Sequence, residues 1–299
     1  MNINRIYSIN EVKRMKIFKS ILFCILYTAI YFIIQVIVQL LMLFVWGYSF
    51  AMENLTLTVI VSSIISFLIY WGIVKLRKQK LASACSFIKF DYSQIPALVL
   101  LGFLIQYFFQ GLILILGLDK LFPEHEAIMK MVFEGGRPLM IILSVIILAP
   151  FIEEVLFRGL IINELKGKMP FVLVIFIQAL IFGVIHGNWL QIIYASILGI
   201  LLGLISTWCH SVWPAIILHI SMNGTPFLSE LLWDSKQIEQ FVSDYRIPVT
   251  VTSGVIVIAI MYFIYRKNHT EPKISAIEIP DSATIQEGET NNEIIQINP

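Results

Sequence analysis

The chain has 299 residues, of which 58% are hydrophobic and 14% are charged, and its formal net charge is +1. An ordinary soluble domain carries about a quarter charged residues. A soluble fold of this length could not bury so much apolar surface, so lipid must be the main solvent of the chain. No basic stripe lies outside the loops that flank the apolar runs, which excludes nucleic acid as an expected partner.

Long stretches without Asp, Glu, Lys or Arg predict the membrane-spanning helices. Each stretch can supply the roughly 20 apolar residues that cross a bilayer. The stretch from Met169 to Ser229 is long enough for three crossings. The sequence therefore predicts an all-α polytopic bundle of about eight transmembrane helices. The predicted spans are 21–46, 55–74, 95–117, 138–163, 170–187, 189–208, 212–230 and 248–265.

The charged residues predict how the chain is oriented and divided. With the N-terminus inside, the inner segments carry 15 Lys and Arg and the outer segments carry five. This positive-inside bias places both termini in the cytoplasm, and we expect a multi-pass protein of the plasma membrane of a bacterium. Residues 1–20 form a basic cytoplasmic N-terminus, and 21–266 form the membrane bundle. Residues 267–299 are polar and acidic and are predicted to be a disordered tail.

The sixth predicted span carries a packing signal. Ala195, Gly199 and Gly203 lie four residues apart, on one face of the predicted helix. Small residues at this spacing let a second helix approach closely. We therefore expect a packing seam on this face.

The fourth predicted span contains Glu153, Glu154 and Arg158, although a charge at the centre of a spanning helix costs about 2.5–3.5 kcal/mol on insertion scales. Glu154 and Arg158 are four apart on one helix face, so we expect them to pair. Glu153 points about 100° away from its neighbour and has no local cation. Burial would make it a stronger base, as a general base near neutrality requires. Pro150 removes one helical hydrogen bond and is expected to kink the span.

Two later spans contain histidines. His186 ends the fifth span, four residues after Phe182, and glycines on either side of it leave space beside the imidazole. His219 and Asn223 are four apart in the seventh span, so they can aim two donors at one point, as an oxyanion hole requires. At about 1.5 Å per residue, Glu153 lies about 17 Å from the cytoplasmic ends of the helices, His186 about 24 Å and His219 about 10 Å. Helix tilt can absorb this spread.

Each group alone has a structural explanation, because an intramembrane histidine or a Glu-Glu-Arg cluster can tether helices. Three polar groups in three charge-poor spans together favour a functional site of the 153–223 region. Carboxylates and histidines also build ion relays, so an ion-coupled transporter is one alternative, although no internal symmetry of that kind is visible. A non-proteolytic membrane scaffold or immunity protein is another.

Taken together, the three patterns resemble the motifs of the CPBP family, the CAAX-processing and bacteriocin-processing intramembrane proteases, also called the Abi family. The first motif is two glutamates with an arginine four residues after the second. The second is Phe-x-x-x-His, and the third is a histidine followed four residues later by asparagine. The matching residues are Glu153, Glu154 and Arg158, then Phe182 and His186, then His219 and Asn223.

The resemblance implies endoproteolysis within the membrane. By this analogy Glu153, helped by His186, activates a water molecule for attack on a peptide carbonyl. His219 and Asn223 would stabilise the oxyanion. The residues that would support the site structurally are Glu154, Arg158 and Phe182.

No cofactor is favoured by the sequence. Zinc is an alternative, because Glu153, His186 and His219 could bind it with an open fourth position, but the chain has no His-Glu-x-x-His helix. The expected partners are the lipid bilayer and a membrane-anchored protein or peptide substrate. The CAAX analogy suggests release of a C-terminal tripeptide from a prenylated protein, with bacteriocin leaders and signal peptides as other substrates of the family.

Overall fold

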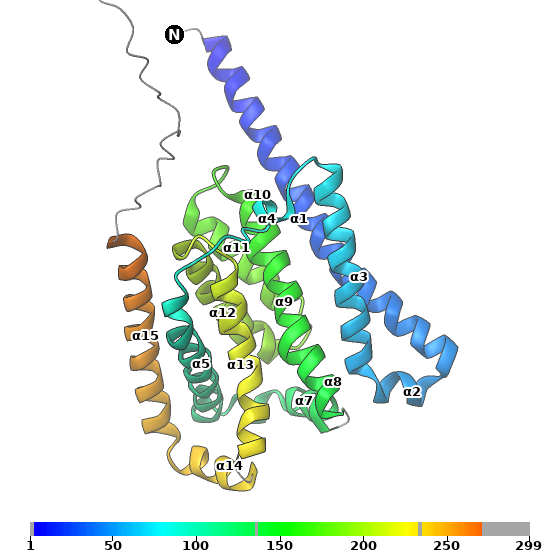
Figure 1. Cartoon of the computed structure of the whole chain (residues 1–299), viewed down its shortest axis with the longest axis vertical. Coiled ribbons are helices and arrows are strands. Elements are labelled where there is room, and N and C mark those ends of the chain that lie inside the picture. The colour runs from blue at the N-terminus through cyan, green and yellow to red at the C-terminus, as the bar shows by residue number, and fades with distance from the viewer. Residues whose placement is uncertain (1–2, 135–136, 233–234, 271–299) are drawn as a thin grey trace, which may run out of the picture.

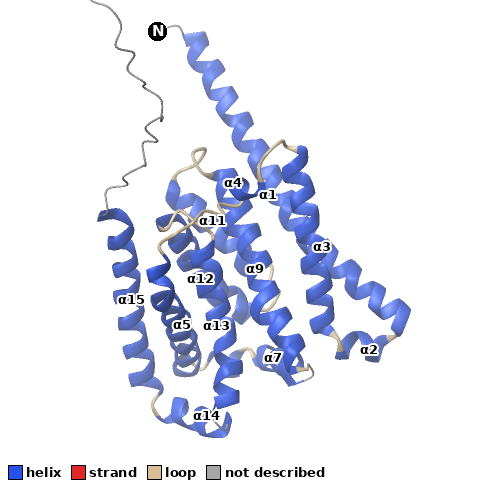
Figure 2. Ribbon diagram, viewed as in Figure 1, coloured by secondary structure: helices blue, strands red, loops and turns tan. Residues whose placement is uncertain are grey.

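The computed structural model describes residues 3–134, 137–232 and 235–270, and within these ranges it contains helices and no strand (Figure 2). The predicted all-α polytopic bundle is therefore confirmed. Six helical stretches are long and apolar enough to cross a membrane, which makes the chain a multi-pass integral membrane protein. They are Arg14–Trp46, Leu55–Leu76, Tyr92–Leu116, Pro138–Leu165, Trp189–Trp208 and Arg246–His269.

These six stretches coincide with six of the predicted spans. The fifth and seventh predicted spans are also helical, as α11 (Phe171–Val184) and α13 (Trp213–Leu232), but they are not among the six. In Figure 1 the start of α1 (Ile3–Trp46) and the end of α15 (Arg246–Thr270) lie at the same end of the molecule, as an even number of crossings requires. The count of eight crossings stays a prediction.

Short helices connect the long ones. The connecting helices are α2 (Tyr48–Glu53), α4 (Leu81–Ala84), the 3₁₀ helix Tyr92–Gln94, α6 (Leu118–Leu121), α7 (Pro123–Glu134) and α14 (Ser235–Asp244). The long helices not yet bounded are α3 (Leu55–Leu76), α5 (Ile95–Leu116) and α12 (Trp189–Trp208). In Figure 1, α1 and α3 stand on one side of the fourth span, and α5 and α15 stand on the other.

The fourth span is not a uniform α-helix. In order it consists of α8 (Pro138–Ile141), a π-helical segment (Ile142–Leu148), α9 (Ala149–Glu154), a second π-helical segment (Val155–Ile161) and α10 (Ile162–Leu165). Pro150 lies in the first turn of α9, where the missing N–H of a proline is tolerated. π-helical turns are rare and occur frequently at functional sites. π-helical segments thus lie on both sides of the acidic pair, whereas the kink expected at Pro150 stays a prediction.

The predicted seam on the sixth span is a contact between α12 and α11. A methyl group added at Gly199 would lie 2.9 Å from the Ala179 Cα, and one added at Gly203 would lie 2.7 Å from the Gln178 side-chain nitrogen. Both separations are shorter than real Cβ atoms show. The absence of a side chain at these two positions is therefore what lets the helices approach, as the spacing predicts.

The predicted domain boundaries at 20 and 267 both fall inside continuous helices. The helix α1 already begins at Ile3, and α15 continues to Thr270. Contacts with the loop before α5 hold this last turn, because Lys267 pairs with Asp91 and Asn268 donates a hydrogen bond to Gln94. The remainder of the predicted tail, 271–299, lies outside the described residues.

Candidate functional site

The predicted pair of Glu154 and Arg158 is present and fully buried. The Arg158 Nη1 donates to the Glu154 Oε1 over 2.8 Å, and both side chains have 0% exposure. The Arg158 Nη2 donates to the backbone carbonyl of Gly199 over 3.0 Å. The guanidinium also lies 4.4 Å above the Phe182 ring centre. Contacts to α11 and α12 therefore fix this charge within the bundle.

The same Gly199 carbonyl accepts a second hydrogen bond, from Gln178 of α11, over 2.8 Å. The sequence patterns did not identify Gln178 as part of the site. The signal that could have found it is composition, because Gln178 is the one strongly polar side chain of α11 and is fully buried. A buried amide needs hydrogen-bond partners, and here it helps to hold the carbonyl that binds Arg158.

The imidazole of His219 lies between the two glutamates. Its Nδ1 is 2.8 Å from the Glu154 Oε1, and its Nε2 is 3.9 Å from the Glu153 Oε2. A carboxylate oxygen that binds arginine acts as an acceptor, so Nδ1 carries the hydrogen and donates it to Glu154. This hydrogen bond directs Nε2 toward Glu153. The 3.9 Å separation there is longer than a hydrogen bond.

Glu153 is buried, with 8% exposure, and its two oxygens have different neighbours. Oε2 faces His219, while Oε1 accepts a hydrogen bond over 3.2 Å from the hydroxyl of Tyr31, on α1. The sequence predicts no local cation for Glu153. No lysine or arginine pairs with it in the part of the chain that the structure describes, and the basic group beside it is His219.

The sequence patterns also did not identify Tyr31, because it lies three spans before the motifs. Its signal is chemical, since a tyrosine hydroxyl inside a membrane-spanning helix needs a hydrogen-bond partner.

His186 lies beside Phe182 at the end of α11. Its Nδ1 is 2.7 Å from the Phe182 carbonyl oxygen, which can only accept, so Nδ1 carries the hydrogen and Nε2 is left as an acceptor. The Phe182 ring centre lies 5.0 Å from that of His186 and 5.8 Å from that of His219. Both imidazoles therefore contact one aromatic ring. Among the described residues no hydrogen bond joins His186 to Glu153.

Asn223 connects α13 to the fourth span. Its side-chain nitrogen donates to the backbone carbonyl of Val145 over 3.0 Å. Val145 belongs to the first π-helical segment, Ile142–Leu148. An asparagine amide has two hydrogens, so one remains for a ligand. The expected role of Asn223 as an oxyanion donor stays a prediction.

The three residues considered for zinc do not form a ligand set. In the described ranges no group of three or more His, Cys, Asp and Glu side chains has the arrangement that holds a metal ion. Glu153 and His219 lie together, whereas His186 is placed by the carbonyl and ring of Phe182. In this arrangement Glu153, His186 and His219 do not form a set of zinc ligands, and the expectation that no cofactor takes part stays a prediction.

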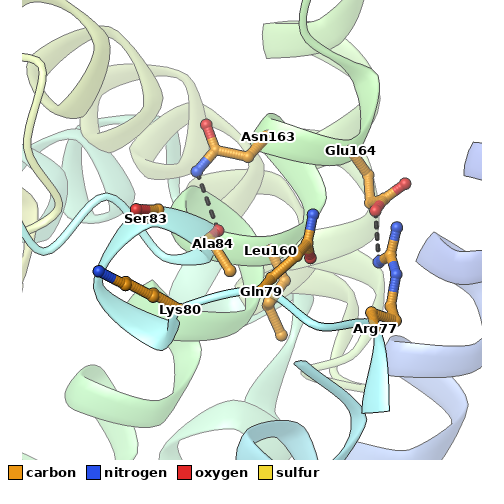
Figure 3. A pocket seen from close by; sticks show the side chains of 8 residues that line it. All are labelled: Arg77, Gln79, Lys80, Ser83, Ala84, Leu160, Asn163 and Glu164. Atoms are coloured by element: carbon orange, nitrogen blue, oxygen red, sulfur yellow. Dashed lines mark hydrogen bonds and ion pairs between the residues drawn. The ribbon is translucent and has the colours of Figure 1, made fainter. Parts of the chain in front are cut away.

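A second charged cluster lies ten residues further along the fourth span. Glu164 pairs with Arg77 over 2.5 Å and with Lys168 over 3.5 Å. It borders a cavity of about 250 Å³ that Lys80 and Asn163 also line (Figure 3). No residue of the predicted site lines this cavity.

A family model matches the segment that contains the motifs. Residues 135–225 match the family described as type II CAAX prenyl endopeptidase Rce1-like. The chain is also 27% identical over 135 residues to the Bacillus subtilis (strain 168) protein described as "Putative membrane peptidase YdiL". That match covers 44% of this chain and 54% of the relative, so it spans about half the length of the relative. No solved structure matches. The resemblance to the CPBP family is therefore confirmed for residues 135–225, the segment that contains all three motifs.

Proposed function

We propose that the protein is an intramembrane endopeptidase in which Glu153 is the general base that activates a water molecule. One observation carries this proposal. Glu153 is a buried carboxylate without a lysine or arginine partner among the described residues, and it faces the imidazole of His219. The match of this segment to CAAX prenyl endopeptidases supports the reaction class.

The geometry suggests where the water binds. The Glu153 Oε2 and the His219 Nε2 are 3.9 Å apart, which one water molecule can bridge with a hydrogen bond of about 2.8 Å to each. Glu153 takes a proton from this water as the oxygen attacks the carbonyl carbon of the peptide bond. The proton then passes to the departing amine, and the peptide is cleaved into a carboxylate and an amine.

His219 is proposed to stabilise the charge that develops on the substrate oxygen. Its Nδ1 hydrogen is held by Glu154, so a proton on Nε2 would point toward the reacting carbonyl. Arg158 compensates the charge of Glu154, as suits a water-poor bundle where an uncompensated charge is costly.

The other two motif residues are proposed to act on the same reaction. His186 has its Nε2 available as an acceptor, so it can assist Glu153 by receiving a proton. Asn223 has one amide hydrogen beyond its bond to Val145, and this hydrogen can serve the oxyanion. In this mechanism no metal takes part.

The proposed substrate is a membrane-anchored protein or peptide precursor. A prenylated protein that loses its C-terminal tripeptide is the first candidate, by analogy with the CAAX prenyl endopeptidases that this segment matches. A prenylated peptide ending in Cys-aliphatic-aliphatic-X is therefore the probe of choice.

The test is cleavage of that peptide by the purified protein in proteoliposomes, followed by mass spectrometry. Glu153→Gln should abolish cleavage while the melting temperature stays near that of the wild type. Glu126→Gln is the matched control, because Glu126 is an exposed glutamate of α7 paired with Lys130, and it should leave cleavage unchanged. Cleavage by Glu153→Gln at the rate of the wild type would refute the proposal. Loss of cleavage when a zinc chelator is added to the wild-type protein would also refute it.

A further inference from the structure

The hydroxyl of Tyr31 gives Glu153 a partner outside the matched segment. It donates to the Glu153 Oε1 over 3.2 Å, and the two residues are separated by 122 positions in the chain. Tyr31 is 4% exposed and Glu153 is 8% exposed. The contact therefore links α1 to α9 in the interior of the bundle.

We infer that Tyr31 is a positioning residue that fixes the carboxylate of Glu153 so that its second oxygen faces His219. This inference rests on the proposed function. A glutamate side chain has three rotatable bonds, and both of its oxygens would otherwise exchange positions. With Oε1 held by the tyrosine, Oε2 stays on the side of the imidazole, where the proposed water binds.

Neighbouring contacts fix the position of the tyrosine itself. One helical turn before Tyr31, the backbone carbonyl of Tyr27 accepts a hydrogen bond over 2.9 Å from the hydroxyl of Tyr70, on α3. The Tyr27 hydroxyl accepts another over 2.8 Å from Arg77. These bonds tie α1 to α3 next to Tyr31. The Tyr31 hydroxyl is thus presented to Glu153 from a helix that two separate hydrogen bonds anchor, so the loss of the Tyr70 bond alone leaves α1 held by Arg77.

The buried tyrosines of this region use their hydroxyls differently. The Tyr70 hydroxyl binds a backbone carbonyl, and its loss removes a structural bond. The Tyr31 hydroxyl binds a carboxylate that we assign to the reaction. Tyr31→Phe and Tyr70→Phe each remove one oxygen from a buried ring, so together they separate positioning from stability.

We expect Tyr31→Phe to lower kcat on the prenylated peptide between about tenfold and a hundredfold, because small displacements of a catalytic group have effects of this size. KM should stay unchanged, because the hydroxyl does not touch substrate. Tyr70→Phe should lower the melting temperature about as much as Tyr31→Phe while kcat stays at the wild-type value. A kcat of Tyr31→Phe within twofold of wild type, or an equal loss in Tyr70→Phe, overturns the inference.

A second readout does not depend on activity. The infrared bands of the Glu153 carboxyl group can be assigned as those missing from Glu153→Gln. Tyr31→Phe should shift these bands, whereas Tyr70→Phe should not, and unshifted bands in Tyr31→Phe also overturn the inference. Failure of the proposed function looks different, because Glu153→Gln would then cleave the peptide like the wild type. Loss of cleavage in Glu153→Gln with full activity in Tyr31→Phe would refute the role of Tyr31 alone.

Discussion

Two glutamates of the fourth span bind arginine in different surroundings. Glu154 binds Arg158 and His219 in the bundle interior, where the glutamate and the arginine have 0% side-chain exposure. Glu164 binds Arg77 and Lys168 at the end of the same span, next to a cavity, and its side chain is 10% exposed (Figure 3). The partners of Glu164 are more open still, with 26% and 34% side-chain exposure.

The comparison shows how burial determines how much stability a glutamate–arginine pair contributes. Water can solvate Arg77 or Lys168 if Glu164 is lost, so each partner of that cluster is replaceable. No such replacement exists around Glu154, because a charge left without its partner in a low-dielectric interior keeps the full cost of desolvation. We therefore expect the inner cluster, which is Glu154 with its two partners, to control folding and activity. The outer cluster, which is Glu164 with its two partners, should add modest stability.

The largest effect is expected from removing the inner arginine. Arg158→Met leaves Glu154 buried without its guanidinium partner, which should cost about 3–5 kcal/mol of stability. Arg77→Met should cost only about 1 kcal/mol, because Lys168 still pairs with Glu164. Thermal melting in detergent measures both. Equal melting temperatures for the two variants would contradict the comparison.

Removing the inner carboxylate should act on both folding and activity, because it leaves Arg158 buried without its ion-pair partner and His219 without its acceptor, so kcat is measured on the folded protein. Glu154→Gln keeps the size of the side chain but weakens the hold on the Nδ1 hydrogen of His219. We expect kcat on the prenylated peptide to fall by about a hundredfold or more, as for other lost orienting carboxylates. Glu164→Gln is the matched control and should stay within about twofold. A normal kcat in Glu154→Gln would show that His219 needs no such orientation.

A smaller effect is expected at Gly199, where α11 and α12 pack together and the backbone carbonyl binds Arg158. In Gly199→Ala the new methyl group would lie 2.9 Å from the Ala179 Cα, so overpacking should cost about 1–3 kcal/mol. Gly72→Ala is the control, because nothing lies within 4 Å of a methyl group at that position on α3. Its melting temperature should equal or slightly exceed that of the wild type. A neutral Gly199→Ala would mean that α11 and α12 can separate freely.

The smallest effect concerns the exposed ion pair between Asp91 and Lys267, which lies at the ends of two spans. Hydrogen bonds from Lys267 and Ser93 lower the pKa of Asp91 from 3.8 to about 2. A lowered carboxylate pKa contributes stability above the ordinary value and loses it as the pH falls toward 2. Because the pair is exposed, Asp91→Asn should cost less than about 1 kcal/mol at pH 7. Melting curves of both proteins should converge between pH 4 and pH 2 and in high salt; a constant difference would contradict this.

Local features of the site were predictable from the sequence, and distant ones were not. The pair of Glu154 and Arg158 follows from their spacing on one helix, and the spans follow from the charge-free runs. The contacts of His219 with Glu154 and of Tyr31 with Glu153 join positions 65 and 122 residues apart. They depend on the rotation and tilt of whole helices, which composition does not fix.

The depth of the site shows the same limit. Counting residues along straight helices puts Glu153 and His219 about 7 Å apart in depth, yet their side chains approach to 3.9 Å. The count assumes one α-helical rise throughout, whereas a π-helical segment, Val155–Ile161, lies between Glu153 and the end of the span from which its depth is counted. Nothing in the charge pattern indicates this segment. Pro150 was the one local sign that the helix departs from regularity.

The hydrogen bond between Tyr31 and Glu153 has a consequence for how much of this chain is needed for the proposed reaction. The family model matches residues 135–225, and that portion contains all three motifs. It does not contain α1. A truncated protein beginning at residue 135 would keep every recognisable signature and lose the hydroxyl that orients Glu153. The smallest complete peptidase would then be the full helical bundle, with its first helix as an integral part of the reaction centre.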